Sequence, residues 1–231
     1  MTEHTVKAYG EALDQLTSEV TRMGALTVSQ VSDAILAATR GDVALAQVVV
    51  GQDGALDELE AQIEADAIRL IALRQPMAQD LRHTVAAMKI ANNLERCGDL
   101  AKNVAKRVVA IADATETVDF DPALQRIGDL ATGLLREVLV AYADRNAEGA
   151  MAVWRRDREI DELHDDFWRD FTAAMQAKPA TVAAGSHLLF VAKNLERIGD
   201  HATNIAELVV YELTGQALRD TDRPRSDTPT A

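Results

Sequence analysis

Aromatic residues make up only 4% of this 231-residue chain, and glycine (12 residues) and proline (5 residues) are also scarce. Strands and their turns depend on β-branched and aromatic side chains and on these two breakers, so an all-β fold is nearly excluded. Hydrophobic residues, largely alanine, leucine and valine, nevertheless reach 48%. That mixture favours helices.

Three further absences limit the environment and the partners. The single cysteine, Cys97, cannot form an internal disulfide, and charges throughout the first twenty residues argue against a secretory signal, so we expect a cytoplasmic protein. No window of 18 residues is free of charge, which argues against membrane insertion. Basic residues (24) are outnumbered by acidic ones (37), giving a net charge of −13 that disfavours nucleic-acid binding.

Hydrophobic residues recur at three- and four-residue steps from Val6 onward and predict a first helix that ends near Thr39. Gly41 and Asp42 are suited to end it and to cap a second helix, which we expect to continue to about Leu73. The further starts and stops are a third helix from Pro76 to about Ala112, a linker over 113–119, a helix start at Pro122, a turn at 145–146, a last helix from Pro179 to about Gly215 and a disordered tail from residue 219.

The six predicted helices are two copies of one unit. Residues 93–105 (NLERCGDLAKNVA) and 194–206 (NLERIGDHATNIA) are identical at nine of thirteen positions, at a separation of 101. Earlier segments align at a separation of 104, for example 57–59 with 161–163. The fold class is therefore all-α, with two tandem three-helix bundles. We assign residues 1–117 to the first, 118–216 to the second and 217–231 to the tail.

Carboxylates recur four residues apart on the second and third helices of both copies, so each pair lies on one helix face. In an antiparallel hairpin the pairs face each other across the groove between these helices. Several acids in a partly desolvated groove repel one another unless a cation neutralises them. The candidate metal ligands are Asp53, Asp57, Glu95 and Asp99 in the first copy, and Asp157, Asp161, Asp165, Glu196 and Asp200 in the second.

The competing interpretation is that these acids form an ordinary solvated face, where Arg96 and Arg197 pair with them. Spacing alone leaves the two interpretations about equal. All-oxygen ligands suit Mg, Mn, Ca or iron better than a dedicated Zn or Cu site, although Zn stays open. His164 and His201 flank the acids, but neither has a histidine counterpart in the other copy. Ala61 stands where the second copy has Asp165, so the first site has one acid fewer.

The two Glu-Arg-x-Gly-Asp segments, at 95–99 and 196–200, and the segment 74–82 (RQPMAQDLR) resemble the PhoU family of phosphate-signalling regulators over about residues 5 to 215. The resemblance implies two three-helix bundles with carboxylate motifs that hold iron or other divalent or trivalent metal ions. It also implies a non-enzymatic negative regulator of the Pho regulon, which couples the ATPase subunit of the phosphate-specific ABC transporter to a sensor histidine kinase. We expect a homodimer that its partners recruit to the inner face of the membrane.

Two alternatives remain. A ferritin-like iron store or enzyme also gathers carboxylates inside a helical bundle, but its Glu-x-x-His motif would need a histidine where Gly98 and Gly199 stand. A helical adaptor that needs no metal would use its acidic faces only for docking. The sequence contains no arrangement typical of a nucleophilic or phosphate-binding enzyme site.

Overall fold

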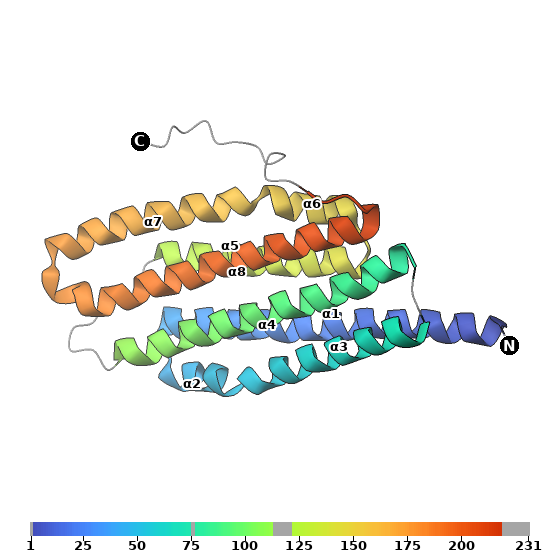
Figure 1. The fold of residues 1–231 in the computed structure, drawn as a ribbon. Helices are drawn as coiled ribbons and strands as arrows, with labels where there is room; N and C mark the ends of the chain where they lie inside the picture. Colours follow the sequence, from blue (N-terminus) through green and yellow to red (C-terminus); the bar gives the residue numbers. More distant parts are fainter. Residues whose placement is uncertain (1, 75–76, 113–121, 219–231) are drawn as a thin grey trace.

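A computed structural model describes residues 2–74, 77–112 and 122–218, and within these ranges the chain is helical, without strands. Figure 1 shows the helices lying side by side in two groups, α1 to α4 and α5 to α8, which are the two copies of the repeat. The helices, in chain order, are α1 (Thr2–Arg40), α2 (Val43–Gly51), α3 (Asp53–Arg74), α4 (Gln79–Ala112), α5 (Pro122–Ala143), α6 (Ala147–Arg155), α7 (Asp157–Ala177), the 3₁₀ turn η1 (Pro179–Thr181) and α8 (Val182–Thr214).

The third helices of the two copies, α4 and α8, pack against each other, and α1 also contacts α5 (Figure 1). As a result the buried residues form one hydrophobic cluster that runs through both copies. Leu94 on α4 and Leu195 on α8, equivalent positions of the repeat, are both nearly inaccessible to solvent. The two copies therefore share a core.

The predicted turns at Gly41, at 145–146 and at Gly215 are present in the structure. Gly41 and Gly215 both have positive φ, at 62° and 74°, a conformation that glycine adopts without steric cost. The Asp42 carboxylate accepts a hydrogen bond from the Leu45 amide at 2.9 Å, and the Asn146 side chain accepts one from the Gly149 amide at 3.0 Å. These caps start α2 and α6 and turn the chain back along the preceding helix.

The predicted uninterrupted middle helix is wrong in both copies. Gln52 separates α2 from α3, and Arg156 separates α6 from α7, at positions 104 residues apart. Both residues have ψ near 0°, and their amides bond three residues back, to Val49 and Val153, which tightens the turn. Each break falls one residue before an aspartate of the candidate site, Asp53 or Asp157.

Some expectations fall outside the described residues: the helix start at Pro76, the linker over 113–119 with the domain boundary near 117, and the tail from 219. In the described part, Pro179 opens the short η1 turn, and α8 begins at Val182. None of the described helices combines the length and the apolar character that crossing a membrane requires.

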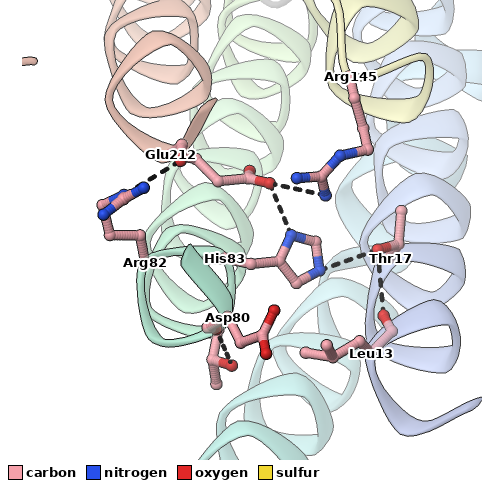
Figure 2. A network of polar contacts seen from close by, with 8 residues as sticks. Leu13, Thr17, Asp80, Arg82, His83, Arg145 and Glu212 are labelled. Atoms are coloured by element: carbon pink, nitrogen blue, oxygen red, sulfur yellow. Dashed lines mark hydrogen bonds and ion pairs between the residues drawn. The ribbon is translucent and has the colours of Figure 1, made fainter. Parts of the chain in front are cut away.

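A buried polar network joins the two copies at the end of α8 (Figure 2). His83 Nδ1 on α4 lies 2.7 Å from Glu212 Oε1 on α8, and both side chains are at most 5% exposed. Arg145 Nη1, in the turn between α5 and α6, lies 3.2 Å from the same carboxylate oxygen. Thr17 Oγ1 on α1 lies 3.0 Å from His83 Nε2, and Arg82 Nε donates to the Glu212 carbonyl at 3.2 Å. The network thus connects three helices and a turn drawn from both copies.

Candidate metal centre

Carboxylates of the second copy converge where α7 passes α8. Asp161 comes from α7, one turn after the helix begins, and Glu196 and Asp200 lie one turn apart on α8. One oxygen from each of these three side chains lies within 4.8 Å of the other two. The structure therefore brings together three of the five acids that the sequence proposes as ligands in this copy.

A glycine lets the two helices approach at this point. Gly199 lies between Glu196 and Asp200, and a Cβ atom placed there would be 2.7 Å from Ile160 Cδ1 on α7. Gly98 occupies the equivalent place in the first copy, against Leu56 on α3. The small residue in each Glu-Arg-x-Gly-Asp segment thus keeps the acid-bearing helices close enough for their carboxylates to face one another.

Burial and mutual repulsion make the cluster unfavourable when it is fully charged. The pKa of Asp200 is raised to about 6, first by burial and then by the charges of Glu196, Asp157 and Asp161. The pKa of Asp161 is raised by the same kinds of cause, with burial again the largest. Lys193 opposes both shifts, and its Nζ lies 2.6 Å from the carboxylate of Glu196, which is only 8% exposed.

Asp157 lies beside the converging acids and is oriented by a hydroxyl group. It is 8% exposed, and Thr203 Oγ1 on α8 donates to its Oδ1 at 2.8 Å. A carboxylate that is held in this way keeps its second oxygen in a fixed direction, and its charge acts on both Asp161 and Asp200.

Asp165 and the neighbouring histidines stand apart from the converging group. The Asp165 side chain is 83% exposed and lies 3.5 Å from His164 Nδ1, although its charge still contributes to the raised pKa of Asp161. His201 Nδ1 lies 2.8 Å from Asn93 Oδ1 on α4, so this imidazole connects the two copies.

Two acids of the first copy, Glu95 and Asp99, lie beside cations. Arg96 lies 3.4 Å from Glu95 through Nε and 3.8 Å from Asp99 through Nη1, and Lys102 Nζ lies 3.8 Å from Asp99. Among the side chains that the structure describes, Asp57, Glu95 and Asp99 do not converge as the acids of the second copy do. The pKa of Glu95 is raised by burial and then by Asp99. Asp53 begins α3, but its side chain lies outside the described part.

Among the described side chains, the carboxylates of the second copy are the ones placed as a metal ion would require. Three converging carboxylates, two of them with raised pKa values, offer oxygen ligands of the kind that Mg, Mn, Ca and iron prefer. Thr203 and Lys193 contact the acids, and the spacing of the carboxylates predicted neither. Aligning the copies pairs Thr203 with Lys102, and that substitution is the signal that the two sites differ.

A separate groove of about 860 Å³ runs between α3, α4 and α8. Its walls are of mixed polarity, and three glutamates, Glu60, Glu64 and Glu207, face it against a single lysine, Lys89. This charge balance disfavours an anion such as phosphate in the groove.

Comparison with known proteins places these observations in a family. The family model described as the PhoU domain matches the chain twice, over residues 20–108 and 124–209. The chain is 53% identical over 227 residues to a protein of Caulobacter vibrioides named phosphate-specific transport system accessory protein PhoU homolog, covering 98% of both chains. A protein of the same name from Rhizobium meliloti is 44% identical, with 97% of this chain and 94% of that protein covered.

Solved structures agree with the sequence comparisons. The crystal structure of PhoU from Pseudomonas aeruginosa superposes with a TM-score of 0.87 at 33% identity and covers 90% of this chain and 100% of that one. The crystal structure of the phosphate transport system regulatory protein PhoU from Streptococcus pneumoniae gives a TM-score of 0.85 at 27% identity, over 91% of this chain and 99% of that one. With its two matched PhoU domains, its acidic helix motifs and relatives that align along nearly its whole length, the chain belongs to the PhoU family.

Proposed function

We propose that this protein is a non-enzymatic negative regulator of phosphate uptake and signalling, which couples the ATPase subunit of a phosphate-specific ABC transporter to a sensor histidine kinase. The observation that carries the proposal is the near-complete alignment with proteins named as accessory to phosphate-specific transport. The protein acts by contact with these partners at the inner face of the membrane, as a homodimer.

A divalent or trivalent cation belongs to the proposal as a structural element of the second copy. Asp161, Glu196 and Asp200 would hold it, and Asp157 would stand behind them with its orientation fixed by Thr203. The bound cation would neutralise the carboxylates. Because α7 and α8 each contribute ligands, the chain's own acids would then fix the distance between these helices.

A deletion strain tests the regulatory role. In phosphate-replete medium, loss of the protein should raise expression of phosphate-scavenging genes, and the wild-type gene should restore repression. A ferritin-like store predicts instead unchanged phosphate genes and altered iron tolerance. Unchanged phosphate-gene expression, together with recovery of neither transporter nor kinase components in a pull-down from membrane extracts, would reject the regulator.

Partner contact can be tested on two exposed apolar residues, one at the end of α3 and one just before α4. Leu73, in the last turn of α3, and Met77, two residues before α4, have side chains that are 71% and 81% exposed. Neither takes part in the buried network around Glu212, so their variants leave it intact. Leu73→Ser with Met77→Ser should weaken recovery of transporter and kinase components. Val48→Ser, at a 53% exposed position on α2, is the matched control. Equal recovery with both variants would exclude these two residues as a contact.

A further inference from the structure

One face of the molecule combines helices of both copies. α3, α4, α8 and α7 follow one another across the side seen in Figure 1, and the fainter α1 and α5 lie behind them. The central pair, α4 and α8, is antiparallel. His201 Nδ1 lies 2.8 Å from Asn93 Oδ1, and a second contact, of 3.4 Å between Arg107 Nη1 and His187 Nδ1, is 14 residues further along α4 and 14 residues earlier along α8. Because the two helices are equivalent in the repeat, a half-turn about an axis normal to this face exchanges them and carries each end of the face onto the other.

One end of this face holds the groove of about 860 Å³ between α3, α4 and α8, which we name the acidic groove. Its charged lining residues are Glu60, Glu64, Glu207 and Lys89. Asn92 Nδ2 donates to Glu60 at 2.8 Å, and Trp154 Nε1 donates to Glu207 at 2.9 Å. Both donors are neutral groups, so these hydrogen bonds orient the two carboxylates without adding a positive charge. Tyr211, which is 41% exposed, contributes to the apolar part of the wall.

The equivalent positions at the other end of the face have the opposite character. In the repeat, the following residues correspond: Glu207 to Lys106, Leu208 to Arg107, Lys89 to Phe190 and Glu64 to Trp168. We name Lys106, Arg107, Trp168 and Phe190 the basic patch. Arg107 Cζ lies 4.5 Å from the centre of the Phe190 ring, and Phe190 and Trp168 are 54% and 45% exposed. α4 carries no acid after Asp99, and α8 carries none before Glu196.

Two copies of the chain can meet across this face about a two-fold axis in either of two directions. If the axis runs along the helices, like ends meet, and the glutamates of the two acidic grooves oppose one another. If the axis runs across α4 and α8, the acidic groove of each chain meets the basic patch of the other, and every contact occurs twice. Opposed like charges disfavour the first arrangement, and opposite charges favour the second.

We propose that two copies of this chain pair through the face formed by α3, α4, α8 and α7, with the acidic groove of each against the basic patch of the other. The pairing rests on the homodimer of the proposed function and gives that dimer a surface and an orientation. Phe190 and Trp168, whose rings are exposed in the single chain, supply aromatic area of the kind that interface cores contain. The charges of Lys106 and Glu64, both exposed, fix which ends meet.

Charge reversal tests the pairing, with the dimer dissociation constant of the full chain measured by sedimentation in chelator. Lys106→Glu and Glu64→Lys should each raise this constant by at least about tenfold, because each substitution places like charges together twice in a symmetric dimer. The two substitutions combined in one chain exchange the charges of the two ends and should recover most of the wild-type affinity. Arg126→Glu, at an exposed position on α5 in the layer behind this face, is the control and should leave the constant unchanged.

The outcomes separate this surface from the rest of the proposed function. A wild-type dimer that neither single charge reversal weakens would overturn the surface and leave the homodimer standing. Two weakened single variants whose combination binds no more tightly than either would overturn the meeting of unlike ends. A wild type that sediments only as a monomer would refute both the pairing and the homodimer. Phosphate-gene expression reports on the regulator separately: if a monomeric wild type still restores repression in the deletion strain, the pairing is refuted and the regulator is not.

Discussion

Neutralising one carboxylate of the second-copy cluster should change stability in opposite directions with and without metal. In the metal-free protein, burial of the Asp200 carboxylate, and then repulsion by three neighbouring acids, raise its pKa to about 6. Asp200→Asn removes both the buried charge and that repulsion, and it should stabilise the protein. With metal present the same change removes a proposed ligand, so the stabilisation that metal gives the wild type should be lost.

The magnitude follows from the pKa. A rise from 3.8 to about 6 corresponds to about 3 kcal/mol of unfavourable interaction in the charged form at neutral pH. Solvent screening of this half-exposed group reduces the figure to about 1 kcal/mol, or roughly 2–4 °C in melting midpoint for a chain of this length. Saturating Mn²⁺ at a hundred times its dissociation constant would stabilise the wild type by about 2.7 kcal/mol. In chelator, Asp200→Asn should therefore melt at a higher temperature than the wild type. In saturating Mn²⁺ it should melt at a lower one.

Thermal melting followed by circular dichroism, in chelator and in Mn²⁺, measures both halves of the prediction. Asp99→Asn is the matched control, because the equivalent carboxylate of the first copy already lies 3.8 Å from both Arg96 and Lys102. That variant should gain no stability in chelator and should keep the full metal effect. A lower midpoint for Asp200→Asn in chelator would refute the repulsion argument, and an undiminished shift with Mn²⁺ would refute the ligand assignment.

Three further outcomes are expected. The metal-free wild type should resist urea better at pH 5 than at pH 7. The reason is that Asp200, whose pKa in the folded protein is raised to about 6, binds its proton more tightly when folded. A lower urea midpoint at pH 5 than at pH 7 would contradict the raised pKa of Asp200. Glu212→Ala should lower the free energy of unfolding by about 2–4 kcal/mol, because it leaves buried polar partners unsatisfied. Glu148→Ala, at an exposed position, is the control and should change the free energy of unfolding little. Equal urea midpoints for the two variants would show that the network does not stabilise the protein. Gly199→Ala should lower the free energy of unfolding by about 1 kcal/mol, since overpacking against Ile160 exceeds the gain in helix propensity. Calorimetry should also show weaker Mn²⁺ binding. Unchanged binding would contradict the argument that Gly199 lets α7 and α8 approach closely.

The sequence was sufficient for the helical class and the duplication, because both rest on periodic patterns that local physics enforces. The pairing of acids across two helices also followed from spacing, and the structure brings Asp161, Glu196 and Asp200 together. Asp165 shows the limit of that reasoning. Each step of four residues rotates a helix position by about 40°, so Asp165 lies about 80° around α7 from Asp157 and its side chain is 83% exposed.

Other features had no local signal. Gln52 and Arg156 interrupt the middle helices although both residue types favour helix, so the breaks come from how the flanking segments pack and not from propensity. His83 and Glu212 are separated by 129 residues and meet only because α4 and α8 lie together. The contacts of Arg96 and Lys102 with Glu95 and Asp99 depend on rotamers of long, flexible side chains, which composition and spacing do not determine.

The position of the acids on α8 connects the candidate metal centre to the contact between the copies. Asp200 and Glu212 lie on one uninterrupted helix, twelve residues or about 18 Å apart. One end of this stretch faces α7 through the carboxylates, and the other end is anchored to α4 by His83 and to the turn after α5 by Arg145. The Glu212 carboxylate cannot leave its partners without leaving buried polar groups unsatisfied. We therefore expect a change in the distance between α7 and α8 at the acids to be resisted at the junction with the first copy.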